Sequence, residues 1–260
     1  MEFDNLLIDT SDGVATLTVN RPQALNALNS EVLDELADAI RMLGRDPSVN
    51  VVVVTGAGDK AFVAGADIAE MAEMNAMEAL GFTRKGQDVV KAFGQMRKPV
   101  IAAVNGYALG GGLEMALACD FIYASEKARF GLPEVTLGIM PGFGGTQNLA
   151  RLIGRAKANE LIFTGRLLKA DEARQWGIVN AVFPPEELLE KAMATARQIA
   201  GNGLLGVAHA KEAVRRGLDM AEEDGLRFES ALVGTLFAST DQKEGMGAFL
   251  EKRKAQFTKA

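Results

Sequence analysis

The sequence contains very little cysteine and histidine: Cys119 and His209 are the only ones among its 260 residues. A single cysteine cannot form a disulfide within the chain, which is typical of proteins from a reducing compartment, so we expect a cytoplasmic protein. Two soft ligands are too few for a structural zinc site, and we expect no metal. His209 lies in a helical stretch with no nucleophile motif nearby, which argues against Ser-His-Asp or Cys-His chemistry.

Long apolar runs and an excess of basic residues are also missing. The longest apolar runs lie near residues 100–104 and 115–118, far short of the about 20 residues that cross a bilayer. The acidic N-terminus lacks the positive region of a secretory signal. The formal net charge is -6, whereas nucleic-acid binders usually carry a basic face. We therefore expect neither a membrane nor a nucleic-acid partner, and a chain with 48% hydrophobic residues that buries a sizeable core.

Strand-like and helix-like patterns alternate over the first two thirds of the chain. The turn signal Ser11-Asp12-Gly13 separates two β-type runs, which predicts a hairpin. Residues 51–54 and 100–104 are apolar runs typical of strands buried on both faces, and residues 77–96 have the spacing of an amphipathic helix. Strands that alternate with helices predict parallel pairing, so the fold class is α/β with helices covering the sheet.

The remaining elements divide the chain into two parts. Residues 105–112 are predicted to form a glycine-rich turn, followed by a helix over 113–119 and a strand over 120–124. The strands stop after about residue 185, and helices are predicted over 186–200, 204–217, 221–239 and 242–256. We expect an α/β core with the functional site in residues 1–195 and a helical region in residues 196–260.

One glycine-rich segment matches a cofactor fingerprint only formally. Gly56-x-Gly58-x-x-Ala61 follows a predicted strand, as dinucleotide-binding loops do. That fingerprint requires a long helix that starts at its third glycine or alanine, here Ala61. Gly65 would interrupt this helix. The P-loop pattern G-x-x-x-x-G-K-[ST] does not occur. The sequence thus argues against a nicotinamide cofactor and against a nucleotide held by a P-loop.

A second segment, Gly110-Gly111-Gly112, follows a predicted buried strand and precedes a helix. Three glycines let backbone N–H groups approach a ligand with no Cβ in the way, and the positive end of the helix dipole points to the same place. This arrangement suits an oxygen that gains negative charge during a reaction. Close packing of a strand against a helix explains the same glycines equally well, and spacing does not separate the two interpretations.

Two glutamates lie beside glycine-rich turns. Glu114 follows the triple glycine, and Glu134 follows Pro133, which suits the first position of a helix. In an arbitrary protein, Glu134 would simply complement the helix dipole. A carboxylate pair that faces one pocket could instead divide acid and base work between its members. Sequence spacing does not tell whether the two side chains face each other.

At these residues the sequence resembles the crotonase family. The matching stretches are RPQALNAL (residues 21–28), FVAGADI (62–68), NGYALGGGLE (105–114), FGLPE (130–134) and PGFGGTQ (141–147), with a further match over residues 249–254. Each stretch alone is weakly specific, but together they run in family order over nearly the whole chain. The resemblance implies a crotonase-like ββα superhelix core and a helical C-terminal region that forms trimers, commonly stacked as hexamers.

The resemblance also implies roles for individual residues. The backbone N–H groups of Ala66 and Gly111 are expected to form an oxyanion hole for a thioester carbonyl. Glu114 and Glu134 match the two catalytic glutamates of the hydratases. The implied reaction is reversible syn addition of water to a trans-2-enoyl-CoA, which gives a (3S)-3-hydroxyacyl-CoA. No metal or redox cofactor is implied, since coenzyme A is part of the acyl-CoA substrate.

Further positions match family contacts to coenzyme A. They are Ala24, Leu25, Ala64, Ala66, Asp67, Ile68, Gly111, Gly142, Phe249 and Lys252. Phe249 and Lys252 match positions that reach the substrate of a neighbouring subunit. Gln23 and Ala69 stand where many relatives carry lysine, a change expected to weaken contacts to the coenzyme A phosphates without touching the reacting centre.

Other functions remain open at this point. Isomerases of the family typically keep the acid that corresponds to Glu134 and replace the other, so the presence of both favours a hydratase. An enoyl-CoA isomerase, a cyclic dienoyl-CoA hydratase and a non-catalytic RNA-binding or scaffold relative are the alternatives. Acyl chain length is not fixed by the sequence. Methionines 71, 74, 77 and 140 could line an adaptable acyl pocket, although methionine is more often an ordinary core residue.

Overall fold

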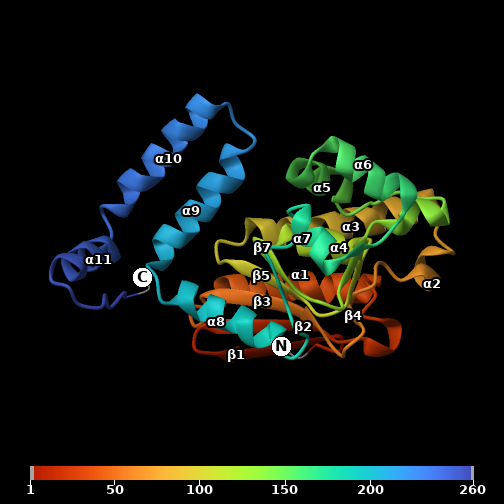
Figure 1. The fold of residues 1–260 in the computed structure, drawn as a ribbon, viewed down its shortest axis with the longest axis horizontal. Coiled ribbons are helices and arrows are strands. Elements are labelled where there is room, and N and C mark those ends of the chain that lie inside the picture. Colours follow the sequence, from red (N-terminus) through yellow and green to blue (C-terminus); the bar gives the residue numbers. More distant parts are fainter. Residues whose placement is uncertain (1–2, 259–260) are drawn as a thin grey trace.

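The computed structural model describes residues 3–258, and Figure 1 shows an α/β body with a helical extension at its C-terminal end. The larger of two sheets has six strands in the order β1-β2-β3-β5-β7-β10. They are β1 (Leu6–Ser11), β2 (Val14–Val19), β3 (Val51–Gly56), β5 (Val100–Val104), β7 (Phe121–Ser125) and β10 (Ala181–Phe183). The β1–β2 hairpin is antiparallel, as predicted, and the other neighbours in this sheet are parallel.

A smaller sheet has four short strands in the order β4-β6-β8-β9. They are β4 (Ala61–Val63), β6 (Tyr107–Leu109), β8 (Arg129–Gly131) and β9 (Leu168–Lys169). β4, β6 and β8 are mutually parallel and follow β3, β5 and β7 in the sequence. The chain therefore repeats a ββα unit, as the resemblance implies. The turn predicted over residues 105–112 is wrong in part, because residues 107–109 pair with β8 and form a strand too short to have a sequence pattern.

Eleven α-helices and two 3₁₀ helices are assigned among residues 3–258. The α-helices are α1 (Ser30–Arg45), α2 (Ile68–Met71), α3 (Ala76–Gln95), α4 (Gly111–Ala118), α5 (Gly145–Ile153), α6 (Arg155–Thr164), α7 (Ala170–Gln175), α8 (Leu188–Ala200), α9 (Leu204–Gly217), α10 (Glu222–Leu236) and α11 (Thr240–Leu250). The 3₁₀ helices are η1 (Pro22–Ala24) and η2 (Pro133–Leu137).

The valine run of β3 explains how the large sheet is covered on both faces. Successive side chains of a strand point to opposite faces. Val52 and Val54 join the main core with α1 and α3, whereas Val51 and Val53 pack against α8. All four valines are fully buried. The prediction of strands buried on both faces is confirmed for β3 and for β5, which is buried along its whole length.

Most predicted helices are found, with shifted ends. The helix predicted over 77–96 is α3, which begins one residue earlier because Asn75 and Glu78 form a capping box. The helix predicted from residue 113 begins at Gly111. The last helix was predicted to run to residue 256 but ends at Leu250, where Lys252 adopts a left-handed φ of 58°.

The helices after α8 form an extension with little core of its own. Figure 1 shows α9 and α10 side by side, projecting away from the sheets, with α11 beyond them. Neither α9 nor α10 contains a buried residue. α8 spans the predicted division at residue 195 and packs on the sheet as far as Ala200. Within residues 3–258, no helix combines the length and apolar character needed to cross a bilayer.

Gly112 shows how closely α4 approaches the small sheet. A Cβ at this position would lie 2.0 Å from the backbone oxygen of Val63 in β4, which is far inside van der Waals contact. We predict that Gly112→Ala displaces α4 and lowers the free energy of unfolding by about 3 kcal/mol or more. Thermal or denaturant unfolding measures this effect.

The matched control is Gly44→Ala in α1, where a Cβ meets no heavy atom within 4 Å. This variant should be neutral or more stable by about 0.5–1 kcal/mol, because alanine has the higher helix propensity. Equal stability of the two variants would contradict the close approach.

Candidate active site

Glu114 is a fully buried carboxylate in the first turn of α4, with only 1% of its surface exposed. Its Oε1 accepts hydrogen bonds from the backbone N–H groups of Phe143 at 2.8 Å and Gly145 at 2.6 Å. Both donors belong to the glycine-rich loop that enters α5. Gly144 lies between them at a φ of 116°, a conformation that favours glycine. The loop therefore wraps the carboxylate with its backbone.

The pKa of Glu114 is raised to about 7. Burial is the largest cause, since it penalises the charged form, and the nearby charge of Glu134 raises the pKa further. Hydrogen bonds from the loop backbone act in the opposite direction and favour the ionised form. The contribution of Glu134 to this shift indicates that the two carboxylates lie near each other.

Glu134 is the second residue of the 3₁₀ helix η2, and Pro133 occupies the first position of this helix. Its side chain is partly buried, and its Oε2 is buried without a hydrogen-bond partner among the described residues. Burial raises the pKa of Glu134 to about 7. Its other oxygen, Oε1, borders the triple glycine: a Cβ at Gly110 would lie 2.9 Å from it. An unpartnered buried carboxyl oxygen is a candidate donor or acceptor for a bound substrate.

The peptide unit between Gly65 and Ala66 presents one candidate oxyanion donor. Its carbonyl, that of Gly65, accepts a 2.9 Å hydrogen bond from the N–H of Leu28. In a trans peptide the N–H points opposite to the C=O, so this bond aims the N–H of Ala66 away from Leu28. Among residues 3–258, the N–H of Ala66 donates to no acceptor. It is thus available to a ligand.

The peptide unit between Gly110 and Gly111 presents the second candidate donor in the same way. The Gly110 carbonyl accepts the first hydrogen bond of α4, from the N–H of Glu114 at 3.0 Å. The N–H of Gly111 therefore points out of the helix N-terminus, and no acceptor for it occurs within the described chain. The two loops adjoin each other, since a Cβ at Gly110 would lie 3.7 Å from the Cα of Gly65.

The positions expected to contact coenzyme A are divided between three regions. Ala64 donates its N–H to the carbonyl of Leu25 at 3.1 Å, so residues 24–25 adjoin the loop of residues 64–68. Leu25 and Ile68 are both exposed, as side chains that meet a ligand would be. Asp67 caps α2 and forms an ion pair with Arg21. These positions therefore lie in or next to the segment that contains Ala66.

The other expected contacts lie elsewhere. Gly142 precedes the loop that binds Glu114 and accepts a hydrogen bond from Gln87. Phe249, 83% exposed, and Lys252 lie at the end of α11, which Figure 1 places at the opposite end of the molecule from α2. Within one chain, the structure does not bring these two residues to the glutamates.

Sequence reasoning missed the residues that hold the site together. The N–H groups of Phe143 and Gly145 fix Glu114, but a backbone donor has no sequence pattern. Arg21 and Asn26 carry no predicted role, although both stand in a matched stretch. Asn26 is fully buried, accepts from the N–H of Arg21, and donates to the carbonyls of Ala57 and Ala61. Because every hydrogen bond of this buried side-chain amide is to the backbone, Asn26 holds the turn of residues 21–28 in place.

The four methionines considered for an acyl pocket fall into two groups. Met71 and Met74 pack against the main core, as ordinary apolar residues do. Met77 and Met140 are well exposed. Their exposure leaves them free to contact a ligand, and the assignment of an acyl pocket to them stays a prediction.

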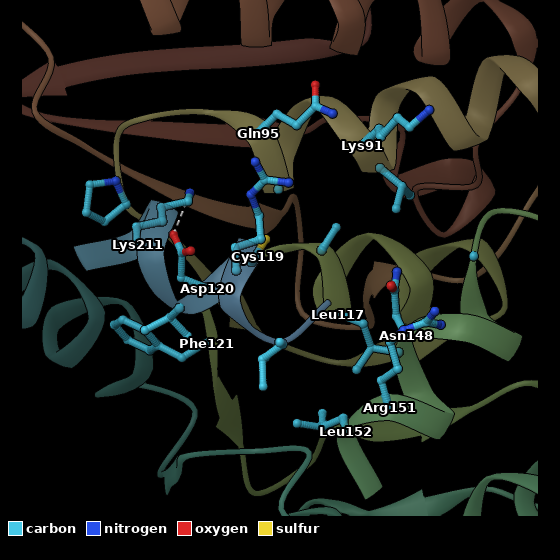
Figure 2. Close-up of a pocket in the computed structure, with 18 of the residues that line it drawn as sticks. Lys91, Gln95, Leu117, Cys119, Asp120, Phe121, Asn148, Arg151, Leu152 and Lys211 are labelled. Carbon is cyan, nitrogen blue, oxygen red and sulfur yellow. Dashed lines mark hydrogen bonds and ion pairs between the residues drawn. The ribbon is translucent and has the colours of Figure 1, made fainter. Parts of the chain in front are cut away.

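A cavity of about 1170 Å³ lies between α3, α5 and α9 (Figure 2), and its lining includes Phe143 and Gly144 of the loop that binds Glu114. Neither Glu114 nor Glu134 lines it. Lys211 of α9 reaches across to Asp120 at 2.8 Å and to the carbonyl of Lys98 at 3.0 Å. Burial raises the pKa of Asp120, although the Lys211 charge opposes that shift. This ion pair ties the helical extension to the core.

Among residues 3–258, the one group of three acids with the spacing of a metal site is Asp4, Glu31 and Glu35. Glu35 accepts hydrogen bonds from the backbone of Asp4 and Asn5, which explains its position without an ion. This group lies in the N-terminal region rather than at the two glutamates.

Two interacting carboxylates beside two aimed N–H groups form a site suited to acid–base chemistry on a carbonyl compound. Comparison with known proteins specifies the family. Residues 9–260 match the enoyl-CoA hydratase/isomerase family model, so the chain belongs to the enoyl-CoA hydratase/isomerase family. The resemblance to crotonases is thereby confirmed.

Individual relatives match over their full length. The chain is 49% identical to a crotonyl-CoA hydratase of Syntrophomonas wolfei, over 99% of both chains. It is 49% identical to a short-chain-enoyl-CoA hydratase of Clostridium acetobutylicum, over 98% of both. The crystal structure of an enoyl-CoA hydratase from Bacillus anthracis is similar, with a TM-score of 0.96 at 41% identity, covering 99% of this chain and 100% of that one. The α/β crotonase fold with C-terminal helices is confirmed by this match.

The raised pKa of Glu114 makes stability depend on pH. Its carboxyl group binds a proton more tightly in the folded than in the unfolded chain, so stability is lost as pH rises from about 4.5 through about 7. Over this range we predict that the free energy of unfolding falls by on the order of 3 kcal/mol more for the wild type than for Glu114→Gln. Denaturant titrations from pH 5 to pH 8 measure the difference.

The control for this titration is Glu126→Gln, at an exposed glutamate directly after β7. Its pH dependence should follow that of the wild type. A Glu114→Gln curve parallel to the wild type would show that Glu114 is ionised in both states throughout this range.

Proposed function

We propose that this protein is an enoyl-CoA hydratase, which adds water reversibly to the double bond of a trans-2-enoyl-CoA. The observation that carries the proposal is the pair of interacting carboxylates, Glu114 and Glu134, beside two backbone N–H groups without internal acceptors. Full-length relatives named crotonyl-CoA hydratase and short-chain-enoyl-CoA hydratase support the same reaction. Hydration needs both an acid and a base, which a carboxylate pair supplies.

The surroundings of the two carboxylates support different proposed roles for them in proton transfer. Glu114 accepts two backbone hydrogen bonds on Oε1, which favours its ionised form and leaves the other oxygen to hold a water molecule. Glu134 has a buried Oε2 without such donors, which favours its neutral form. In the proposed step, Glu114 takes a proton from the water as its hydroxide adds to Cβ, and Glu134 gives its proton to Cα. Both groups are proposed to add from the same side of the double bond, and the (3S) configuration of the product is proposed from the family resemblance alone.

The two N–H groups stabilise the charge that this step creates. Addition at Cβ moves electron density onto the thioester oxygen, which becomes enolate-like in the transition state. The N–H groups of Ala66 and Gly111 are proposed to donate to that oxygen. Donors fixed before the reaction need no reorganisation when the charge appears. The chemistry requires no metal or redox cofactor, and coenzyme A arrives as part of the substrate.

We predict that Glu114→Gln and Glu134→Gln each lower kcat for crotonyl-CoA by roughly 10²–10⁴-fold, because each removes one proton-transfer group. Loss of the enoyl-thioester absorbance measures the rate. The wild-type kcat/KM should follow a bell-shaped pH profile near neutral pH, since the coupled pair works with one proton shared between two groups of pKa about 7.

The exposed Glu126→Gln variant serves again as the control and should keep wild-type activity. A folded wild type that leaves crotonyl-CoA unchanged would rule out short-chain hydration. Longer and cyclic enoyl-CoA substrates, and movement of a double bond, would then be tested in turn.

The helical extension is proposed to pack against other copies of the chain, as a trimer or a hexamer of two trimers. Large apolar side chains on α9, α10 and α11 or directly after them are at least half exposed: Val214, Leu218, Leu226, Phe237, Met246, Phe249 and Leu250. A helix pair with no buried residue and so many exposed apolar groups needs a partner surface. A neighbouring copy would also fill the cavity beside α9 and accept Phe249 and Lys252 near its own substrate. Cytoplasmic location stays a prediction.

Light scattering coupled to gel filtration tests this assembly. We predict a mass three or six times that of the chain, and dissociation of the assembly when Leu218→Asp places a charge in the apolar surface of α9. The control is Leu7→Asp, which adds the same charge at an exposed leucine of β1 and should leave the mass unchanged. A monomeric wild type would contradict the proposed assembly.

A further inference from the structure

We propose that Arg21 is a positioning residue for the oxyanion hole, acting on the N–H of Ala66 through two successive peptide units. This inference rests on the proposed function, because it assigns the Ala66 N–H to the thioester oxygen. Arg21 lies just before η1, at the start of a turn that ends at Leu28. Its side chain is mostly buried, with 16% of its surface exposed.

The connection runs through hydrogen bonds that share peptide planes. Arg21 Nη1 donates to the carbonyl of Ala27 at 2.7 Å. The same peptide unit carries the N–H of Leu28, which donates to the carbonyl of Gly65 at 2.9 Å. That carbonyl in turn belongs to the peptide unit that presents the N–H of Ala66. The guanidinium thus fixes one peptide plane, and this plane fixes the next.

Two further contacts hold the ends of this connection together. Both terminal nitrogens of Arg21 lie 3.3 Å from Oδ2 of Asp67, the residue after Ala66. The N–H of Asp67 donates to the carbonyl of Leu28 at 2.9 Å. Ala66 is therefore bracketed: Leu28 binds the residue before it and the residue after it. Arginine suits this position because its planar group can donate to a carbonyl and a carboxylate at once, which lysine does less well.

The turn that follows Arg21 contains two residues other than glycine in left-handed backbone conformations. Leu25 and Asn26 both adopt left-handed conformations, with φ values of 51° and 60°. Such conformations cost free energy in residues other than glycine, and they persist where the surroundings fix them. Asn26 fixes the turn by donating to Ala57 and Ala61 and accepting from Arg21. These hydrogen bonds thus hold the turn, and with it the backbone orientation in which Leu28 binds Gly65, against the cost of the left-handed conformations.

The test compares Arg21→Gln and Arg21→Lys with the wild type in two measurements. The first is steady-state hydration of crotonyl-CoA. The second is the infrared band of the thioester carbonyl in bound butanoyl-CoA labelled with ¹³C at that carbon, which reports directly on hydrogen bonds to the oxygen. Butanoyl-CoA has no double bond and is not hydrated, so its band is readable even if the proposed reaction is wrong.

We expect Arg21→Gln to lower kcat roughly 10- to 100-fold, with KM changed less than about threefold, because a displaced donor affects the transition state most. The carbonyl band should move back toward its frequency in free butanoyl-CoA. Arg21→Lys should lie between Arg21→Gln and the wild type in both measurements. Arg197→Gln is the control: it removes a long-range ion pair with Asp12 remote from the site and should change neither reading.

Three results would overturn the proposal: unchanged kcat in folded Arg21→Gln, a rise in KM alone, or a fall in kcat with an unmoved carbonyl band. If Arg21→Gln does not fold, the same two measurements on Arg21→Lys decide, and a wild-type band there overturns it. Absence of hydration by the wild type would instead contradict the proposed function.

Discussion

The parallel pairing of β4, β6 and β8 determines where every part of the candidate site lies. Ala66 follows the end of β4 at Val63, Gly111 follows the end of β6 at Leu109, and Glu134 follows the end of β8 at Gly131. Because parallel strands end at the same edge of a sheet, three segments far apart in the sequence meet there. Each repeat of the ββα unit thus contributes to the site. The first supplies the N–H of Ala66, the second the N–H of Gly111 and the carboxylate of Glu114, and the third the carboxylate of Glu134.

Glycine is required where these segments approach one another. Gly110 borders both Glu134 and Gly65, and Gly112 leaves no room for a Cβ against β4. Close approach has a second consequence, since it places N–H groups where no internal acceptor reaches them. Unsatisfied backbone donors cost stability when they are shielded from water, and proteins rarely keep them without a reason. At Ala66 and Gly111 the carbonyl of each peptide unit is bonded and the N–H is not. That asymmetry is what makes each peptide unit a donor aimed at a ligand.

The sequence predicts the elements with strong patterns and the residues with distinctive chemistry. Residues 51–54 of β3 and 100–104 of β5 were predictable because burial on both faces produces uninterrupted apolar runs. Glu114 and Glu134 were predictable as candidates from their glycine-rich neighbours, and as a pair only from the family resemblance. The strands of the small sheet were not predictable, because two or three residues are too few to show an alternating pattern. The hydrogen bonds from the N–H groups of Phe143 and Gly145 to Glu114 could not be predicted for a different reason. They depend on the conformation of a loop in space.

Burial of both carboxylates opposes stability and serves chemistry at the same time. Burial raises the pKa of each carboxyl group to about 7, and the charge of Glu134 adds to the shift of Glu114. Near neutral pH the pair therefore holds about one proton between two sites. Equal surroundings would leave that proton undirected. The loop breaks the symmetry, because Phe143 and Gly145 donate to Glu114 while the Oε2 of Glu134 has no partner within residues 3–258. These donors offset part of the burial effect at Glu114, so both carboxyl groups have a pKa of about 7, and the proposed mechanism places the shared proton on Glu134.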